Sequence, residues 1–211
     1  MTAIPAFGAD SNQIEFNFGR ATPSNSLQAG PDDQQLGGSG LAWSIDALHQ
    51  MGKYFDIGLG GGHYHSSPNQ STLFLPNSTT ALSSRSTNIL LLGRINFNAG
   101  SRGTFYAIGG LGWARNTLAL TASPATPWTD TGTMESRVLI NTSKDTFCYM
   151  GGVGLELPLW GSFLIGGDIR YQGTTSAGYS LTPSGASLVG RTDLRTAVNA
   201  ILMSLKVGIK Y

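Results

Sequence analysis

The sequence predicts an all-β protein, an eight-stranded antiparallel up-and-down transmembrane β-barrel. Three observations lead to this fold class. The chain contains eight runs in which apolar residues alternate with polar or small ones, and no segment shows a convincing helical period. Short and long connections alternate strictly between the runs, and one face of the runs is almost purely apolar.

The composition excludes several classes of protein. The 211 residues suffice for one sizeable domain, and only 12% of them are charged, about half of the usual share. The net charge of +1 provides no basic surface for nucleic acid, so no nucleic-acid partner is expected. Cys148 is the only cysteine, which leaves no disulfide framework and no cysteine metal cluster. We expect neither a metal site nor a cofactor.

Helical membrane spans are also excluded. The longest purely aliphatic run, 89–92, is far shorter than the roughly 20 apolar residues that a spanning helix needs. The first ten residues have neither the basic start nor the apolar run of a signal peptide. A membrane protein built of strands is compatible with all of these observations.

The strands follow an N-terminal segment, 1–11, and the barrel is expected to occupy 12–211. Most of the runs have about the 9–11 residues with which a tilted strand crosses a bilayer. The eight predicted strands lie near 12–20, 40–49, 54–64, 87–97, 104–114, 147–157, 163–172 and 196–211.

The connections between these strands are of two kinds. Tight turns are predicted around 50–53, 98–103 and 158–161. Long loops rich in Ser, Thr, Pro, Asn and Gly are predicted at about 21–39, 65–86, 115–146 and 173–195. In an up-and-down meander, all short turns and both termini then lie at one end, as in bacterial outer-membrane barrels. Within the third loop, 117–122 and 136–142 are predicted to extend strands five and six beyond the membrane.

One face of the strands carries apolar residues almost exclusively. Within the strands, the only formal charge on this face is Arg20, at the end of strand one. In chain order the apolar face consists of Ile14, Phe16, Phe18, Leu41, Trp43, Ile45, Ala47, Phe55, Ile57, Leu59, Ile89, Leu91, Ile95, Phe97, Phe105, Ala107, Leu111, Trp113, Tyr149, Val153, Leu155, Leu157, Phe163, Ile165, Ile169, Tyr171, Ile201, Met203, Leu205, Val207, Ile209 and Tyr211.

The opposite face carries charges and many glycines, and the charges are predicted to form a network in the lumen. The network residues are Glu15, Asp46, Asp56, Arg94, Glu156, Asp168, Arg170, Lys206 and Lys210. Five acids face four bases, which indicates internal ion pairs, because charges in a narrow lumen persist only when they are paired and hydrogen-bonded. The candidate pairs join Arg94 and Arg170 to Glu156, Asp168 and Asp56.

Alternation alone does not decide which face points inward. A soluble lipocalin-like barrel would enclose the apolar face around a ligand, whereas an outer-membrane barrel would turn it toward lipid. The aromatic residues favour the second arrangement, because they gather toward both ends of the strands as belts at two interfaces would. The belt at the long-loop end comprises Phe18, Trp43, Trp113, Tyr149 and Tyr171, and the belt at the short-turn end comprises Phe55, Phe97, Phe105, Phe163 and Tyr211.

Four segments share a glycine-rich alternation that ends, in the last of them, on an aromatic residue. They are FYAIGGLGWARN (105–116), GGVGLEL (151–157), GGDIRYQ (166–172) and LMSLKVGIKY (202–211). They resemble the strands of small eight-stranded outer-membrane barrels, the class of the OmpA transmembrane domain, OmpX and the opacity proteins. The resemblance spans nearly the whole chain and implies a porin-like fold at the surface of a Gram-negative cell, in contact with outer-membrane lipids and lipopolysaccharide. It also implies that Tyr211 is the assembly signal for the barrel-assembly machinery, and we expect no peptidoglycan-binding domain after it.

The stretch IGLGGGHYHSSP, which begins at Ile57, is the strongest candidate for a chemical site. His63 and His65 are too few for a zinc site, which usually has three or four ligands. The glycines are not a phosphate loop, because neither a helix start nor Lys-Ser/Thr follows them. We expect His63 to mark the outer rim, where Arg20 and Arg115 also end apolar stripes within reach of lipid phosphates.

A catalytic site is not predicted. His65 and Ser67 offer the His-x-Ser spacing used by some barrels that modify lipid A. Nucleophilic catalysis also needs an acid that orients the histidine, and the paired strands carry none on this face, since Asp130 and Glu135 lie in the third loop. The chain is therefore predicted not to be an enzyme, and a lipid A-modifying barrel is the alternative.

The predicted function is display at the cell surface. A barrel this narrow fills its own interior, so no pore for large solutes is expected. The four long loops would contact a partner outside the cell: another protein, a host surface in adhesion, or lipopolysaccharide. A soluble lipocalin-like ligand carrier is the second alternative.

Overall fold

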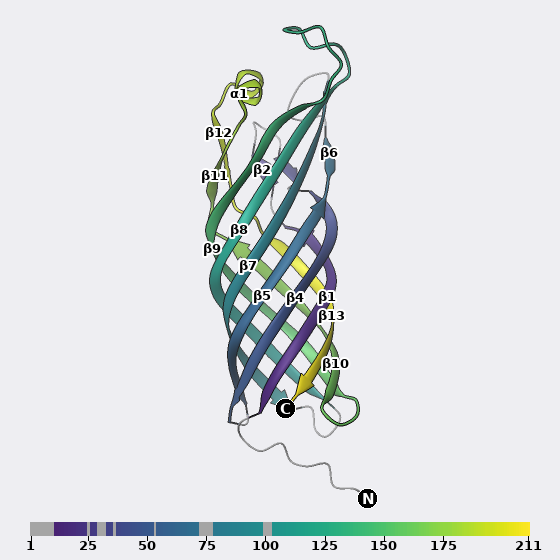
Figure 1. Ribbon diagram of the computed structural model, residues 1–211, viewed down its shortest axis with the longest axis vertical. Helices are drawn as coiled ribbons and strands as arrows, with labels where there is room; N and C mark the ends of the chain where they lie inside the picture. The colour runs from purple at the N-terminus through teal and green to yellow at the C-terminus, as the bar shows by residue number, and fades with distance from the viewer. Residues whose placement is uncertain are drawn as a thin grey trace, which may run out of the picture.

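The computed structural model describes residues 11–24, 26–28, 33–35, 37–52, 54–71, 78–98 and 103–211. Over this part of the chain, eight antiparallel strands close into a barrel in which each wall strand pairs with the preceding and the following one (Figure 1). The wall strands are β1 (Asn12–Pro23), β4 (Gly38–Met51), β5 (Phe55–Ser67), β7 (Ser78–Asn98), β8 (Thr104–Pro124), β9 (Arg137–Pro158), β10 (Phe163–Thr174) and β13 (Ala200–Lys210). The predicted fold class is therefore confirmed.

The barrel closes where the two ends of the chain meet. β13 pairs with β1 along the whole length of both strands. At the short-turn end, Asn12 and Tyr211 exchange two backbone hydrogen bonds of 2.9 and 3.0 Å. Because these bonds join the first and last wall strands, no sheet edge is left open at this seam.

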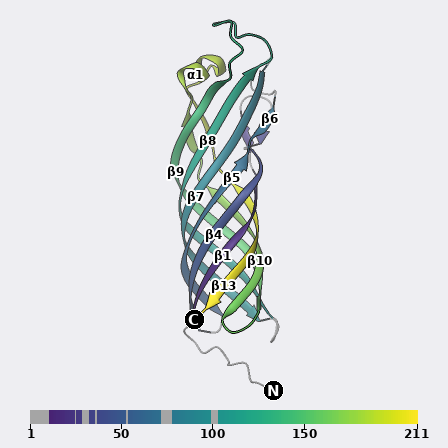
Figure 2. The same ribbon diagram turned by 45° about the vertical axis from the view of Figure 1, so that its right-hand side comes forward.

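Shorter elements lie at the end of the barrel opposite Tyr211 (Figures 1 and 2). β2 (Ser26–Gln28) pairs with β3 (Asp33–Gln35), and β11 (Ala177–Ser180) pairs with β12 (Asp193–Thr196). β6 (Asn69–Ser71) pairs with β7 beyond the end of β5. These elements lie in the predicted long loops 21–39, 65–86 and 173–195, apart from the last residue of β12.

Helix α1 (Pro183–Val189) is a short helix that was not predicted, although no segment shows a helical period. Thr182 caps its N-terminus, since Gly185 N donates a 3.1 Å hydrogen bond to Thr182 Oγ1, and Gly190 ends it at a φ of 70°. Seven residues make about two turns, too few to show a helical period, so only the caps could have revealed the helix. Among the described residues, no helix is both long enough and apolar enough to span a membrane.

The apolar face of the strands points out of the barrel. Leu205, Ile89 and Leu59 on this face are 77, 68 and 62% exposed, whereas charged residues of the opposite face such as Arg94 and Lys206 are almost fully buried. A lipocalin-like carrier requires the reverse arrangement, so that alternative is wrong. A continuous apolar outer surface is the surface that lipid acyl chains require.

Three neighbouring strands are longer than predicted. β7, β8 and β9 have 21, 21 and 22 residues, whereas β1 has 12 and β13 has 11. The predicted extension of strands five and six is confirmed, with β9 beginning at Arg137. β7 begins well before its predicted start near residue 87. The prediction missed this part of the strand because Ser and Thr replace apolar residues on its outward face and weaken the alternation.

The extensions of these three strands form what we call the outer wall, residues 78–87, 114–124 and 137–147. β7, β8 and β9 reach further than the other strands of the barrel wall (Figure 2). Its backbone pairing is continuous from the short turn to Ser78, which lies opposite Pro124. The sheet therefore continues through much of the ranges 65–86 and 115–146, which were expected to be loops.

Candidate functional site

The lower lumen contains an ion-pair layer centred on Arg94. Arg94 Nη1 donates hydrogen bonds of 2.5 Å to both Glu15 Oε1 and Glu156 Oε1. Its Nε and Nη2 lie 2.6 Å from Asp56 Oδ2. Lys206 Nζ contacts Glu15 and lies 3.2 Å from Glu156 Oε1. These side chains are almost fully buried, so each charge is stable there only because its partners replace water.

A second ion-pair layer is centred on Arg170. Its Nη2 lies 2.7 Å from Asp46 Oδ2 and 2.6 Å from Asp168 Oδ2. Tyr106 joins the two layers, because its hydroxyl donates to Asp168 at 3.0 Å and accepts from Lys206 Nζ at 2.6 Å. The structure thus brings eight of the nine predicted network residues together.

Lys210, the ninth, is half-buried at the short-turn end, opposite Gln13 in the register of β13 and β1. The uncharged residues of the two ion-pair layers, Gln13 and Tyr106, were not among the predicted network residues. Gln13 Oε1 accepts from Arg94 Nη2 at 3.1 Å, and the Tyr106 ring lies 5.0 Å from the Arg94 guanidinium carbon and 4.3 Å from Lys206 Nζ. Their inward parity, shared with the charged residues, is the signal that could have identified them.

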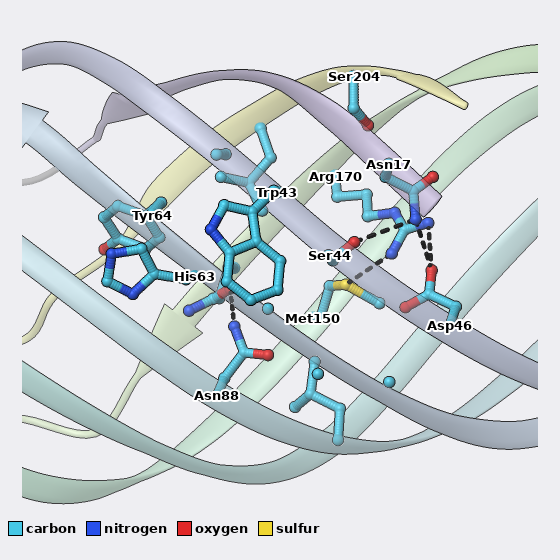
Figure 3. A pocket seen from close by; sticks show the side chains of 17 residues that line it. Asn17, Trp43, Ser44, Asp46, His63, Tyr64, Asn88, Met150, Arg170 and Ser204 are labelled. Carbon is cyan, nitrogen blue, oxygen red and sulfur yellow. Dashed lines mark hydrogen bonds and ion pairs between the residues drawn. The ribbon is translucent and has the colours of Figure 1, made fainter. Parts of the chain in front are cut away.

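Gly60, Gly61 and Gly62 of IGLGGGHYHSSP border a small chamber in the lumen (Figure 3). Its volume is about 30 Å³, and polar residues such as Asn17, Ser44 and Arg170 line part of it. A Cβ atom at Gly60 would lie 2.7 Å from Asp46 Oδ1, so this position has no room for a side chain. The glycines therefore leave space for the second ion-pair layer.

Apolar side chains close the lumen beyond these layers. Tyr64, Leu118 and Leu120 from the wall strands are almost fully buried in one cluster. Tyr179 and Leu194, from β11 and β12, belong to the same cluster. We call this cluster the mouth plug. It packs the fourth long connection against the inner face of the wall.

The structure places all ten predicted belt residues on the outer surface. Their exposed fractions run from 38% for Tyr171 to 71% for Trp113. Neighbouring members contact one another, since Phe97 lies opposite Phe105 and the rings of Tyr149 and Tyr171 are 6.3 Å apart. Their sites along the strands are compatible with two belts at the edges of the apolar surface.

The outward face becomes polar above the upper group of aromatic residues. On β7 the outward series changes from Ile89 to Thr87 and Arg85, and on β8 it changes from Trp113 to Arg115 and Thr117. The backbone pairing continues across this change. The outer wall therefore has a water-compatible outer face and marks the outer limit of the apolar surface.

The tip of the outer wall is ordered by its own contacts. Trp128 Nε1 donates a 2.8 Å hydrogen bond to Glu135 O, and the Arg137 guanidinium carbon lies 4.7 Å from the Trp128 ring. Arg137 also donates two hydrogen bonds of 2.8 Å to Asp130. The guanidinium holds the pKa of the Asp130 carboxyl below its usual range. This cluster was not predicted, because its members follow no periodic pattern.

Among the described residues, no acid contacts His65 or Ser67, the candidate catalytic residues. His63, which was expected to mark the outer rim, is partly exposed; its Nδ1 lies 2.8 Å from Thr87 Oγ1 and its ring lies 6.1 Å from that of Trp43. His65 lies opposite Arg85 in the strand register, and Asp130 is bound to Arg137 at the wall tip. In the described part of the chain, no three His, Cys, Asp or Glu side chains converge as metal ligands.

Comparisons with solved structures show the same fold. OprG of Pseudomonas aeruginosa, an outer-membrane protein, matches with a TM-score of 0.58 and 14% identity, over 99% of this chain and 99% of that one. Neisserial surface protein A matches at 0.51 and 13%, over 95% and 97%. Ail, the attachment invasion locus protein of Yersinia pestis, solved with the heparin analogue sucrose octasulfate, matches at 0.50 and 9%, over 96% and 99%. Comparisons with protein-family models and with curated protein sequences give no match. The fold is that of small bacterial outer-membrane barrels, as the resemblance implied.

Proposed function

We propose that this chain, whose fold is that of bacterial outer-membrane barrels, presents its outer wall to a partner outside the cell. The observation that carries the proposal is the ordered wall tip. The contacts among Trp128, Asp130 and Arg137 fix the shape of the tip before any partner binds. A surface that is already ordered loses less conformational entropy on binding, which favours recognition.

A display role also agrees with the filled lumen. The two ion-pair layers and the mouth plug occupy the interior, and the chamber between them has room for about two water molecules. A passage for large solutes would have to displace buried, mutually paired charges, at a high desolvation cost. The barrel therefore acts as an anchor for the wall.

Two similar proteins support this proposal through their names. One is called a surface protein, and the other is an attachment invasion locus protein solved with a heparin analogue. By analogy, we propose that the partner of the outer wall is a protein or polysaccharide of a cell surface. We also propose that the barrel-assembly machinery recognises Tyr211. No catalytic step is proposed, because His65 and Ser67 have no orienting acid in the described surroundings.

The orientation of the barrel is tested by cysteine labelling in intact bacteria. Thr129→Cys places a thiol at the exposed wall tip, and Ser162→Cys places one in a short turn. Cys148 is buried and should give little background. A membrane-impermeant maleimide is expected to label the first variant in intact cells and the second only after lysis. Labelling of the short turn alone in intact cells would reject the proposal.

The role of the tip is tested by replacing residues 125–135 with a short Gly-Ser turn. Bacteria that express the two forms are compared for adherence to immobilised extracellular-matrix protein and to heparin. The replacement is expected to abolish adherence while gel mobility before and after boiling still reports a folded barrel. Equal adherence of both forms would show that the tip is not the contact surface.

A further inference from the structure

We infer that a hollow on the outer face of the outer wall binds a lipid-linked phosphate group of lipopolysaccharide. The hollow has a volume of about 140 Å³ and is bordered by His65 on β5, Ser83 and Arg85 on β7, Thr117 on β8 and Asn141 on β9. The inference rests on the proposed orientation, with the outer wall outside the cell.

Strand register brings these residues together. His65 lies opposite Arg85, and Arg85 lies opposite Thr117. Ala119 lies opposite both Ser83 and Asn141. The Ser83 hydroxyl and the Asn141 amide therefore lie on either side of the small Ala119 side chain. Side chains on one face of paired strands are near neighbours, and the hollow is therefore a property of the sheet and not of a loop.

The chemistry of the hollow fits an anion with several acceptor oxygens. A guanidinium, an imidazole, two hydroxyls and an amide all supply hydrogen-bond donors, and none of the residues that line the hollow is acidic. Arg85 is exposed and forms no ion pair with any described residue. A planar guanidinium that lacks a carboxylate partner is well suited to bind phosphate through two hydrogen bonds.

The surrounding charges also favour an anion. Arg115 is a diagonal neighbour of Arg85, since Arg85 lies opposite Thr117, two residues further along β8. The nearest acid in the register is Asp145, which lies opposite Arg115 and not opposite Arg85. Two arginines and a histidine therefore share this part of the surface with a single carboxylate.

The height of the hollow selects a lipid-linked phosphate. Arg85 lies four residues beyond Ile89, after which the outward series of β7 becomes polar. At about 3.3 Å per residue and a tilt of about 45°, this places Arg85 roughly 9 Å above the apolar surface, at the level of lipid headgroups. The apolar face directly below would contact the acyl chains of the same lipid.

The test compares binding of two lipids by the purified barrel in detergent micelles. The probes are bisphosphorylated lipid A and the same lipid after enzymatic removal of both phosphates. Wild type is expected to bind the phosphorylated form about tenfold more tightly, as one charge-assisted contact would give. Arg85→Glu is expected to abolish this difference. The matched control is Arg191→Glu, the same charge reversal at an exposed position outside the hollow, which should retain it.

Three results would overturn the inference. Equal affinity of wild type for both lipids would show that phosphate is not recognised. An unchanged preference in Arg85→Glu would place the site elsewhere. Displacement of the lipid by an equal concentration of inorganic phosphate would identify a free anion as the ligand. Because the labelling of Thr129→Cys reports orientation separately, each of these results leaves the display proposal standing.

Discussion

Gly60 is a residue at which side chains in the lumen limit the size of the residue. A Cβ there would lie 2.7 Å from Asp46 Oδ1 and 2.8 Å from Leu92 Cδ1, and Asp46 is held by Arg170 and Asn17. We expect Gly60→Ala to lower the free energy of unfolding by roughly 1–3 kcal/mol, measured by urea titration in lipid vesicles.

The neighbouring Gly61 provides the control for this substitution. It faces outward, and the nearest atom to its Cβ position is Asn88 O at 3.7 Å, an ordinary contact. Gly61→Ala is therefore expected to leave the unfolding curve almost unchanged. If the two variants lost equal stability, crowding in the chamber would not be the cause.

Arg94 is the residue on which the lower ion-pair layer depends. Arg94→Met would leave Glu15, Asp56 and Glu156 buried without their shared cation. Removing one partner of a buried ion pair costs roughly 3–5 kcal/mol, and we expect a loss of this size in the same urea titration. Combining Arg94→Met with Glu156→Gln should cost less stability than the sum of the two single losses. Additive losses in the double variant would contradict a shared network.

Arg20→Met provides the control for these variants. Arg20 lies on the exposed outer surface, so its replacement should have little effect on the free energy of unfolding.

At the scale of elements, the wall tip should respond to acid. The pKa of the Asp130 carboxyl is lowered because Arg137 donates hydrogen bonds to its charged form. A carboxyl with a lowered folded-state pKa stabilises the tip above its unfolded pKa, and this contribution is lost as the pH falls through the folded value. We expect the NMR signal of the Trp128 indole N–H to remain constant near neutral pH and to shift and broaden in acid.

Arg137→Met provides the control for the acid response. It removes both hydrogen bonds to Asp130 and the stacking on Trp128, so the indole signal should be perturbed already at neutral pH. A wild-type signal that stayed constant from about pH 7 to about pH 2 would show that the ion pair does not order the tip.

Elements differed in how far the sequence could predict them. Strands that face lipid outside and charges inside, such as β1 and β13, alternate sharply and were placed to within a few residues. The upper half of β7 has Ser and Thr on both faces and therefore alternates weakly, so its extent became visible only through its pairing with β8. α1 depends on its capping residues, and a helix of two turns has no period to detect.

Some properties of the site residues could likewise be predicted from the sequence, and others could not. Charges on one strand face predicted which residues enter the lumen, because parity determines direction. Parity does not give height around a tilted barrel, so it could not show that Arg94 and Arg170 belong to different layers. The hollow beside Arg85 combines residues from four strands, and only the register of the outer wall brings them together.

At the scale of the whole molecule, the closed barrel should resist unfolding in detergent. Backbone hydrogen bonds close the ring between β13 and β1, so unfolding requires many bonds to break together. We expect the folded protein to migrate differently in a detergent gel with and without boiling. Removal of detergent should cause aggregation, because the outer apolar surface would then face water. A monodisperse protein in detergent-free buffer would contradict a lipid-facing exterior.

The filled lumen predicts that the reconstituted barrel does not pass small sugars. A solute would have to separate Arg94 and Lys206 from their buried carboxylates and then displace the mouth plug. Liposomes that contain the wild type are therefore expected not to swell in arabinose, whereas liposomes with a general porin should swell.

A variant of the mouth plug tests whether the plug or the ion-pair layers prevent solutes from passing through the barrel. Leu194→Ser places a polar group in the plug and should loosen it without altering the ion-pair layers below. Liposomes with this variant should still not swell, because the Arg94 layer crosses the whole lumen from β1 through β7 to β9. Swelling with Leu194→Ser alone would show that the plug, and not the charged layers, closes the barrel. Swelling with the wild type would show that the interior opens on the time scale of solute passage, and a role as a closed anchor would then be excluded.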